Sequence, residues 1–107
     1  MTTRTLQILL ALVEGPLHGY GIKQSVHDRT GGAVRLGSGT LYEAVHRLVQ
    51  QNHIEEVPTP TSEPSSGGPP RRFYALTPSG REALAEEVRR MDDVVRYARD
   101  QDLIAEG

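Results

Sequence analysis

The chain has 107 residues, a formal net charge of −2 and no cysteine. This length suits one small domain, which buries roughly two-thirds of the surface of its unfolded state. The lack of cysteine excludes disulfides, thiolate zinc sites and a cysteine nucleophile, and it fits a cytoplasmic location. One Phe, four Tyr and no Trp provide little core volume, so we expect a marginally stable monomer and an oligomeric protein.

The acidic charge lies near the C-terminal end. Residues 1–76 contain seven basic and six acidic side chains, whereas residues 77–107 contain five and eight. A near-neutral first part predicts that any DNA affinity is modest and sensitive to salt.

Residues 3–14 are predicted to form a helix that is apolar nearly all round, which indicates burial on more than one side. We interpret this run as a core helix rather than a signal peptide, because no small-residue cleavage site follows it, and it is too short to span a bilayer. A second helix is expected over residues 17–29, and two glycines end it. A minimal strand is expected at residues 33–36.

Residues 38–51 are predicted to form the helix around which the domain is organised. Thr40 and Glu43 fit a capping box, so we expect the helix to begin between Ser38 and Thr40, with its first amides free to attract phosphate. An apolar stripe predicts the buried face: Leu41, Tyr42, Val45, Leu48 and Val49. The opposite face is predicted to point outward, toward DNA or simply toward solvent: Thr40, Glu43, Ala44, Arg47 and Gln51.

A hairpin is predicted after this helix. Residues 54–57 and 71–76 read as its two strands, joined by a loop at residues 58–70. The loop is rich in Pro, Thr, Ser and Gly and is longer than usual, so we expect a mobile tip that engages a partner.

A long last helix is predicted to begin at Thr77 and Pro78 and to reach about Gln101. Its apolar residues repeat at four-three spacing, which is typical of a coiled-coil seam. The seam residues are: Leu84, Val88, Met91, Val95 and Ala98. We expect this seam to pair with a second copy of the chain; packing back on its own domain is the alternative.

The sequence contains no pattern that predicts catalysis, a metal site or a cofactor. His18, His27, His46 and His53 lack the spacing of zinc ligands. The glycines of residues 32–38 lack the lysine of a phosphate-binding loop, and no Gly-x-Ser-x-Gly or defensible carboxylate pair is present. We therefore expect no enzyme and no bound cofactor or metal.

The order of these elements predicts an α+β, mainly helical fold, namely a winged helix-turn-helix with a long C-terminal dimerisation helix. Residues 1–76 would form the DNA-binding domain, with the wing at about residues 53–76, and residues 77–107 would form the dimerisation helix. The third helix would then enter the major groove of DNA, and the wing would reach the adjacent backbone.

Four segments between about residues 6 and 90 together form a specific pattern. They are: Leu9-Leu10-Ala11-Leu12 with Gly15-Pro16-Leu17-His18-Gly19-Tyr20; Gly39-Thr40-Leu41-Tyr42 with Ala44 and Arg47-Leu48; Gly68-Pro69-Pro70-Arg71-Arg72-Phe73-Tyr74; and Leu76-Thr77 with Gly80-Arg81. In this order they resemble the PadR family of transcriptional regulators.

The resemblance implies a homodimeric repressor of operator DNA, which in many such proteins is released by a small hydrophobic effector. It implies base or backbone contacts from the recognition helix and phosphate contacts from the wing stem, and we add the amides at the helix start. The expected DNA-binding residues are: Ser38, Gly39, Thr40, Tyr42, Arg47, Arg71 and Arg72.

The first and last helices are expected to form the subunit interface. The expected dimerisation residues are: Leu6, Leu9, Val13, Leu84, Val88, Met91, Val95 and Ala98. A candidate effector pocket between the subunits would be lined by: Leu9, Leu12, Val13, Val88, Met91 and Val95. The alternative is that these side chains fill the interface and leave no pocket. We favour this alternative, because apolar residues at helical spacing are usually core.

The chain departs from the family pattern in the recognition helix. The family commonly has proline where Ser38 and Glu43 stand, and lysine is frequent at the position of His46. Glu43 brings a negative charge near the DNA face unless it caps Thr40, whereas protonation of His46 would add a positive charge there. A winged-helix protein-interaction module without specific DNA binding is therefore the alternative function.

Overall fold

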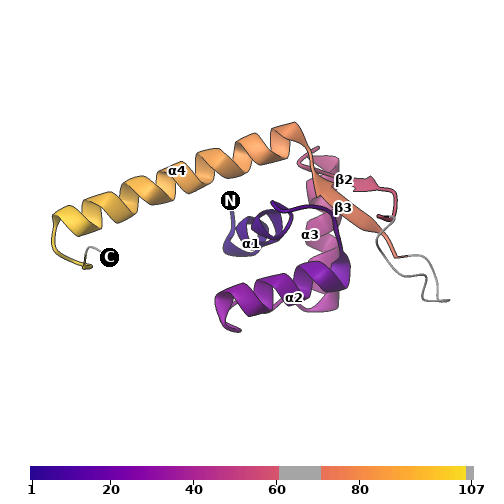
Figure 1. The fold of residues 1–107 in the computed structure, drawn as a ribbon, viewed down its shortest axis with the longest axis horizontal. Coiled ribbons are helices and arrows are strands. Elements are labelled where there is room, and N and C mark those ends of the chain that lie inside the picture. The colour runs from indigo at the N-terminus through magenta and orange to yellow at the C-terminus, as the bar shows by residue number, and fades with distance from the viewer. Residues whose placement is uncertain (61–70, 106–107) are drawn as a thin grey trace.

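The computed structural model describes residues 1–60 and 71–105 of the chain. Within these residues the elements are, in chain order: α1 (Thr3–Ala11), β1 (Leu17–His18), α2 (Gly19–Thr30), α3 (Ser38–Gln50), β2 (Ile54–Val57), β3 (Phe73–Leu76) and α4 (Pro78–Asp100). The strands form an antiparallel sheet in the order β1-β3-β2. Figure 1 shows α1, α2 and α3 gathered together beside the sheet, and α4 leading away from it. The predicted α+β winged-helix fold is confirmed.

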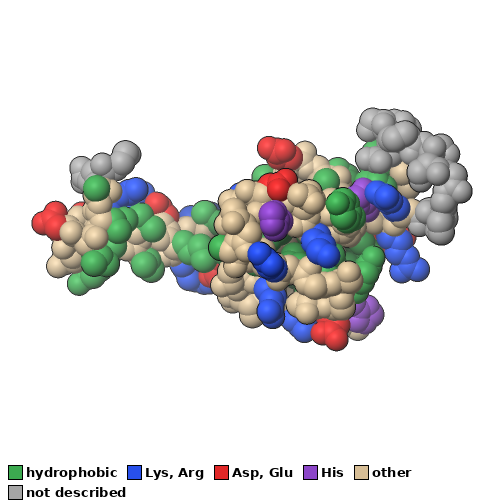
Figure 2. Space-filling view, turned by 90° about the horizontal axis from the view of Figure 1, so that it is seen from below, with side chains coloured by type: hydrophobic (Ala, Val, Ile, Leu, Met, Phe, Trp, Pro, Cys, Tyr) green, Lys and Arg blue, Asp and Glu red, His purple; other side chains and the backbone are tan. Residues whose placement is uncertain are grey.

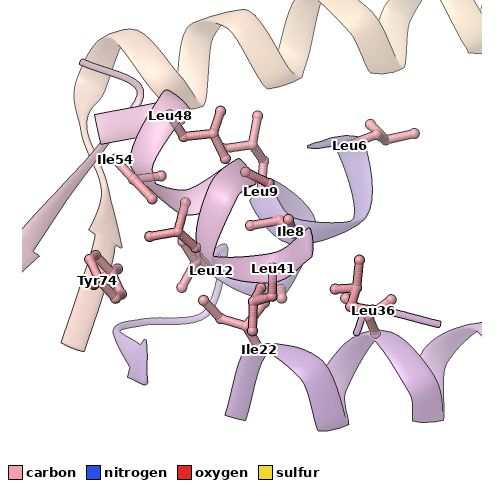
Figure 3. Packing of buried hydrophobic residues seen from close by; sticks show 14 of the residues in the cluster. Leu6, Ile8, Leu9, Leu12, Ile22, Leu36, Leu41, Leu48, Ile54 and Tyr74 are labelled. Atoms are coloured by element: carbon pink, nitrogen blue, oxygen red, sulfur yellow. The ribbon is translucent and has the colours of Figure 1, made fainter. Parts of the chain in front are cut away.

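The hydrophobic core lies between α1, α2 and α3 and is closed by the sheet (Figure 3). As the apolar run predicted, α1 buries side chains around most of its circumference. The largest fully buried side chains are: Ile8, Leu9, Leu12, Ile22, Val26, Leu48 and Ile54.

Four residues expected at the subunit interface or in an effector pocket lie in this core, one of them Leu84 of α4. Leu6, Leu9 and Leu12 are all buried within a single chain. Because their side chains are already enclosed in the core cluster, they have almost no surface left for a partner or a ligand.

The start of the second helix differs from the prediction. Leu17 and His18 form the short strand β1, pairing with Tyr74 and Phe73 of β3, so α2 begins two residues later than expected. Residues 33–36 form no strand, and Leu36 is buried in the core instead. The alternation of these residues therefore reflects two side chains, Val34 and Leu36, that pack against the core, and no backbone pairing.

The wing consists of β2, β3 and the residues between them. The two strands pair in antiparallel register from Ile54 opposite Leu76 to Val57 opposite Phe73, as the hairpin prediction required. Residues 61–70 of the expected mobile tip lie outside the described residues.

The first turn of α4 is fixed against the end of α3 and the start of β2. The Thr77 hydroxyl accepts a hydrogen bond from the Gly80 amide at 3.0 Å and donates one to the Asn52 carbonyl at 2.5 Å. Gly80 lies so close to the His53 backbone that a Cβ would overlap its carbonyl group. The helix begins after Thr77 and ends at Asp100, as predicted.

Polar contacts also hold the first half of α4. Arg81 donates a hydrogen bond to the Val13 carbonyl at 3.1 Å. The Glu87 carboxylate forms ion pairs with the Met1 amino group at 3.4 Å and with Arg90 at 3.0 Å. Partial burial raises the pKa of Glu87, but hydrogen bonds and positive charge from Arg90 and the amino group outweigh it, so the pKa lies below its usual value. The second half of α4 projects away from the other elements (Figure 1).

Candidate nucleic-acid interface

One stripe of α3 faces the core, and its position differs from the prediction. The buried residues have the i, i+3, i+4, i+7 spacing of a helix face: Leu41, Ala44, Val45 and Leu48. Tyr42 and Val49, expected in this stripe, are 60% and 40% exposed, whereas Ala44, expected outside it, is 7% exposed. Ala44 is small enough to be covered by neighbouring parts of the chain, whereas Tyr42 is amphipathic and can pack its ring edge at the surface while it stays largely exposed.

The outer face of α3 is therefore polar and exposed. The residues opposite the buried stripe are: Gly39, Glu43, His46 and Gln50. Tyr42 borders this row on one side and Arg47 on the other, as their helical positions require. The two predicted contact residues Tyr42 and Arg47 thus serve different edges of one surface.

The start of α3 lacks the predicted capping box. Gly37 is the N-cap residue, no side chain caps the helix, and Ser38 is the first helical residue. Leu41 is the first residue whose amide bonds within the helix, to the Gly37 carbonyl at 2.9 Å, so the preceding amides lack helical partners. Glu43 does not cap the helix and is exposed on its outer face.

An open hollow of about 590 Å³, the α1 hollow, lies on the Arg47 side of α3. Its lining residues come from α3, from the start of α1 and from the loop before α3: Thr2, Thr3, Arg4, Thr5, Ala33, Val34, Thr40, Glu43, Ala44 and Arg47. Two predicted contact residues, Thr40 and Arg47, thus lie with Arg4 at the edge of α3 that faces α1.

A second open hollow of about 570 Å³, the wing hollow, lies on the Tyr42 side. It is lined by residues of β1, α2, α3 and the wing: His18, Gly19, Tyr20, Tyr42, Arg71, Arg72 and Tyr74. The structure therefore brings three predicted contact residues together, because Tyr42 shares this hollow with Arg71 and Arg72. It separates them from Arg47.

The wing hollow also contains His18 and Tyr20, which the sequence did not predict as contact residues. Arg71 Nη1 lies 2.9 Å from His18 Nε2, although 53 residues separate the two in sequence. Arg72 lies 3.9 Å from Glu56, and both side chains are exposed, so this ion pair contributes little to stability. The sequence feature that could have indicated these two residues is the His18-Gly19-Tyr20 run, which is part of the family pattern.

The α4 helix exposes apolar side chains where it leaves the core (Figure 2). Val88 and Met91 are 41% and 45% exposed, and Val94 and Tyr97 are still more exposed. Val95 and Ala98 are partly covered, and Val13, two residues after the end of α1, is exposed. Leu84, expected in the same seam, is buried in the chain's own core. The free apolar strip therefore starts at residue 88 rather than 84.

Within the described residues, no three histidine, cysteine, aspartate or glutamate side chains gather as a metal site would require. In the same part of the chain, none of the helices combines the length and the apolar character needed to cross a membrane.

Comparison with known proteins supplies relatives for this fold. A protein of transposon TN4556 from Streptomyces fradiae is 38% identical over 84 residues, which are 78% of this chain and 21% of that protein. The chain thus spans about a fifth of that relative. A transcriptional regulator of Mycobacterium tuberculosis is 32% identical over 91 residues, covering 85% of this chain and 78% of that protein.

Solved structures show the same fold. A PadR family transcription regulator of Clostridium difficile superposes with a TM-score of 0.77 at 26% identity, covering 96% of this chain and all of that one. Bacillus subtilis PadR in complex with operator DNA superposes with a TM-score of 0.68 at 22% identity, covering 81% of this chain and 47% of that one. Residues 8–86 match the transcriptional regulator PadR-like family. The chain therefore belongs to the PadR-like family of transcriptional regulators.

Proposed function

We propose that the protein regulates transcription by binding operator DNA as a homodimer, with α3 in the major groove and the wing on the adjacent backbone. The observation that carries this proposal is the wing hollow, where Tyr42 of α3 lies beside Arg71 and Arg72 of the wing. Helix and wing thus offer one continuous surface to a duplex. A related fold, that of Bacillus subtilis PadR, was solved in complex with operator DNA.

The outer row of α3 and the Arg47 that borders it carry side chains able to read bases. A B-DNA major groove admits one α-helix, and its base edges carry a distinct pattern of donors and acceptors. Arg47 is exposed and can bond guanine bidentately or hold a phosphate. Glu43 can accept a hydrogen bond from a cytosine amino group, which would turn its negative charge into a source of selectivity.

The apolar strip of α4 supports the homodimer. Val88, Met91 and Val94 are too exposed for a helix that stays single in water, and a second copy related by a two-fold axis would cover them. A symmetric dimer places its two α3 helices on half-sites separated by about 34 Å, one turn of DNA, or a multiple of it. We further propose a cytoplasmic location and release by a small hydrophobic effector that enters beside this strip.

Single arginine variants test the role of each part of the surface. Arg47→Gln should weaken operator binding by about 1–3 kcal/mol and reduce the preference for operator over scrambled DNA if it reads a base. Arg72→Gln should weaken binding to both duplexes equally and lower the salt slope by about one. Arg89→Gln, on exposed α4, is the matched control and should change neither.

The alternative function is a protein-interaction module that keeps the winged helix without an operator. The exposed Glu43 and the near-neutral charge of residues 1–76 favour it. Weak and equal binding to both duplexes, unchanged in the Arg47→Gln and Arg72→Gln variants, would support the module and contradict the regulator.

A further inference from the structure

The His18 ring faces two hydrogen-bond donors at once. The Gly21 amide donates to Nδ1 at 2.9 Å, and Arg71 Nη1 lies 2.9 Å from Nε2. A neutral imidazole has one unprotonated nitrogen and one N–H group, and a protonated imidazole has two N–H groups. The ring can therefore accept from at most one of these donors.

The Gly21 amide is the donor that is more firmly fixed against the His18 ring. His18 is the N-cap of α2, and its Nδ1 satisfies an amide of the first turn that has no helical partner. The Phe73 ring packs edge-on against it, with centroids 5.1 Å apart. Arg71, in contrast, ends in a flexible and exposed guanidinium group. Nδ1 therefore keeps the lone pair, and Nε2 carries the proton.

With this tautomer, Nε2–H of His18 and the guanidinium of Arg71 are two donors that face each other without an acceptor. No carboxylate of the described residues forms an ion pair with Arg71; the nearby Glu56 is paired with Arg72 instead. Tyr42 lies on the same hollow, with its hydroxyl beside Gly19 at the start of α2. The two nitrogens are 2.9 Å apart, which leaves no room between them. A small displacement of the exposed Arg71 side chain would let one negatively charged oxygen, bound beside the pair, accept hydrogen bonds from both donors.

We propose that His18 and Arg71, flanked by Tyr42, form a phosphate site in the wing hollow and that a DNA backbone phosphate occupies it. This proposal rests on the proposed function, because it assigns the occupant of a surface that α3 and the wing present to DNA. It makes His18 a direct phosphate ligand in addition to the cap of α2. Inorganic phosphate has the same chemistry and is the competing occupant.

Nitrogen-15 NMR of the histidine rings tests the tautomer without any substitution. In the free protein at pH 8, Nε2 of His18 should carry the proton and Nδ1 should not. Added duplex DNA should shift the Nε2 and Hε2 resonances of His18 and leave those of His27 unchanged. A proton on Nδ1, with Nε2 accepting from Arg71, would overturn the proposal, and so would a His18 ring that responds to inorganic phosphate at constant ionic strength but not to duplex.

A variant separates the cap from the phosphate contact. His18→Asn keeps a side-chain oxygen for the Gly21 amide but is too short to bridge toward Arg71. Its Tm should fall only by the packing that Phe73 loses, and its DNA affinity should fall about tenfold. Arg71→Gln removes a permanent positive charge, so it should in addition lower the salt slope by about one. His27→Asn, at the exposed far end of α2, is the matched control.

The outcomes distinguish this proposal from the proposed function. If the parent prefers its operator but His18→Asn binds equally well, the phosphate site is refuted and the regulator stands. If His18 responds to every duplex and the parent shows no operator preference, the phosphate site stands and operator recognition is refuted. Should the asparagine variant fold poorly, the NMR measurement on the parent protein decides alone.

Discussion

Val88 and Met91 are the side chains through which we expect α4 to hold a second copy of the chain. They are 41% and 45% exposed in one chain. Complete burial of such a side chain is worth about 1.5–3 kcal/mol, so the exposed part represents about 0.6–1.3 kcal/mol for each residue. A two-fold interface contains both residues twice, which gives about 2.5–5 kcal/mol for the dimer. Alanine retains a Cβ, so the loss in the double variant Val88→Ala/Met91→Ala should lie toward the lower end of this energy range. The dimer Kd should therefore rise about 100-fold.

Analytical ultracentrifugation over a dilution series measures this change directly. The matched control, Arg89→Ala/Asp93→Ala, truncates two exposed side chains on the opposite face of α4 and should dimerise like the parent. A double apolar variant with the parent's Kd would refute the assignment of the strip. A parent protein that stays monomeric at every concentration would refute the dimer itself.

Three further predictions concern the contacts that fix the first half of α4 to the rest of the domain. Gly80→Ala forces a Cβ against the His53 carbonyl and should destabilise the protein by about 3 kcal/mol in urea unfolding; an unchanged midpoint would contradict this packing. Thr77→Ala should cost about 1–2 kcal/mol and Thr77→Ser much less, unless the hydroxyl plays no capping role. Because the pKa of Glu87 is lowered beside Arg90, Glu87→Gln should be less stable than the parent at about pH 6. This difference in stability should close as the pH falls below the ordinary carboxyl pKa of about 4.3. A difference that stays constant with pH in thermal melts would exclude the ion pair.

Features with local sequence determinants were predicted well. The start of α4 depends on Thr77 and Pro78, whose side chains act within one turn, and both were read correctly from sequence. The end of α2 likewise depends on Gly31, which adopts a left-handed conformation with φ of 62°. The hairpin followed from the composition of its strands.

Features that depend on distant partners were not predicted. β1 has only two residues and forms because it pairs with the edge of β3. No local sequence pattern therefore predicts it. The rotation of α3 about its axis buries Ala44 and leaves Tyr42 exposed. Hydrophobicity alone predicts the opposite order of burial for these two residues, because it takes no account of which parts of the chain cover them. The contact between His18 and Arg71 joins residues 53 positions apart, and only the folded chain brings them together.

Fluorescence anisotropy with labelled DNA from immediately upstream of the protein's own gene tests the central claim most directly. The comparison duplex is a scrambled sequence of the same composition, and both are titrated at two salt concentrations. We predict tight binding that prefers the natural sequence, weakens with salt as phosphate contacts require, and shows a smaller preference in Arg47→Gln. Equal and weak binding to both duplexes, repeated with other promoters, would contradict the claim that α3 and the wing form an operator-binding surface.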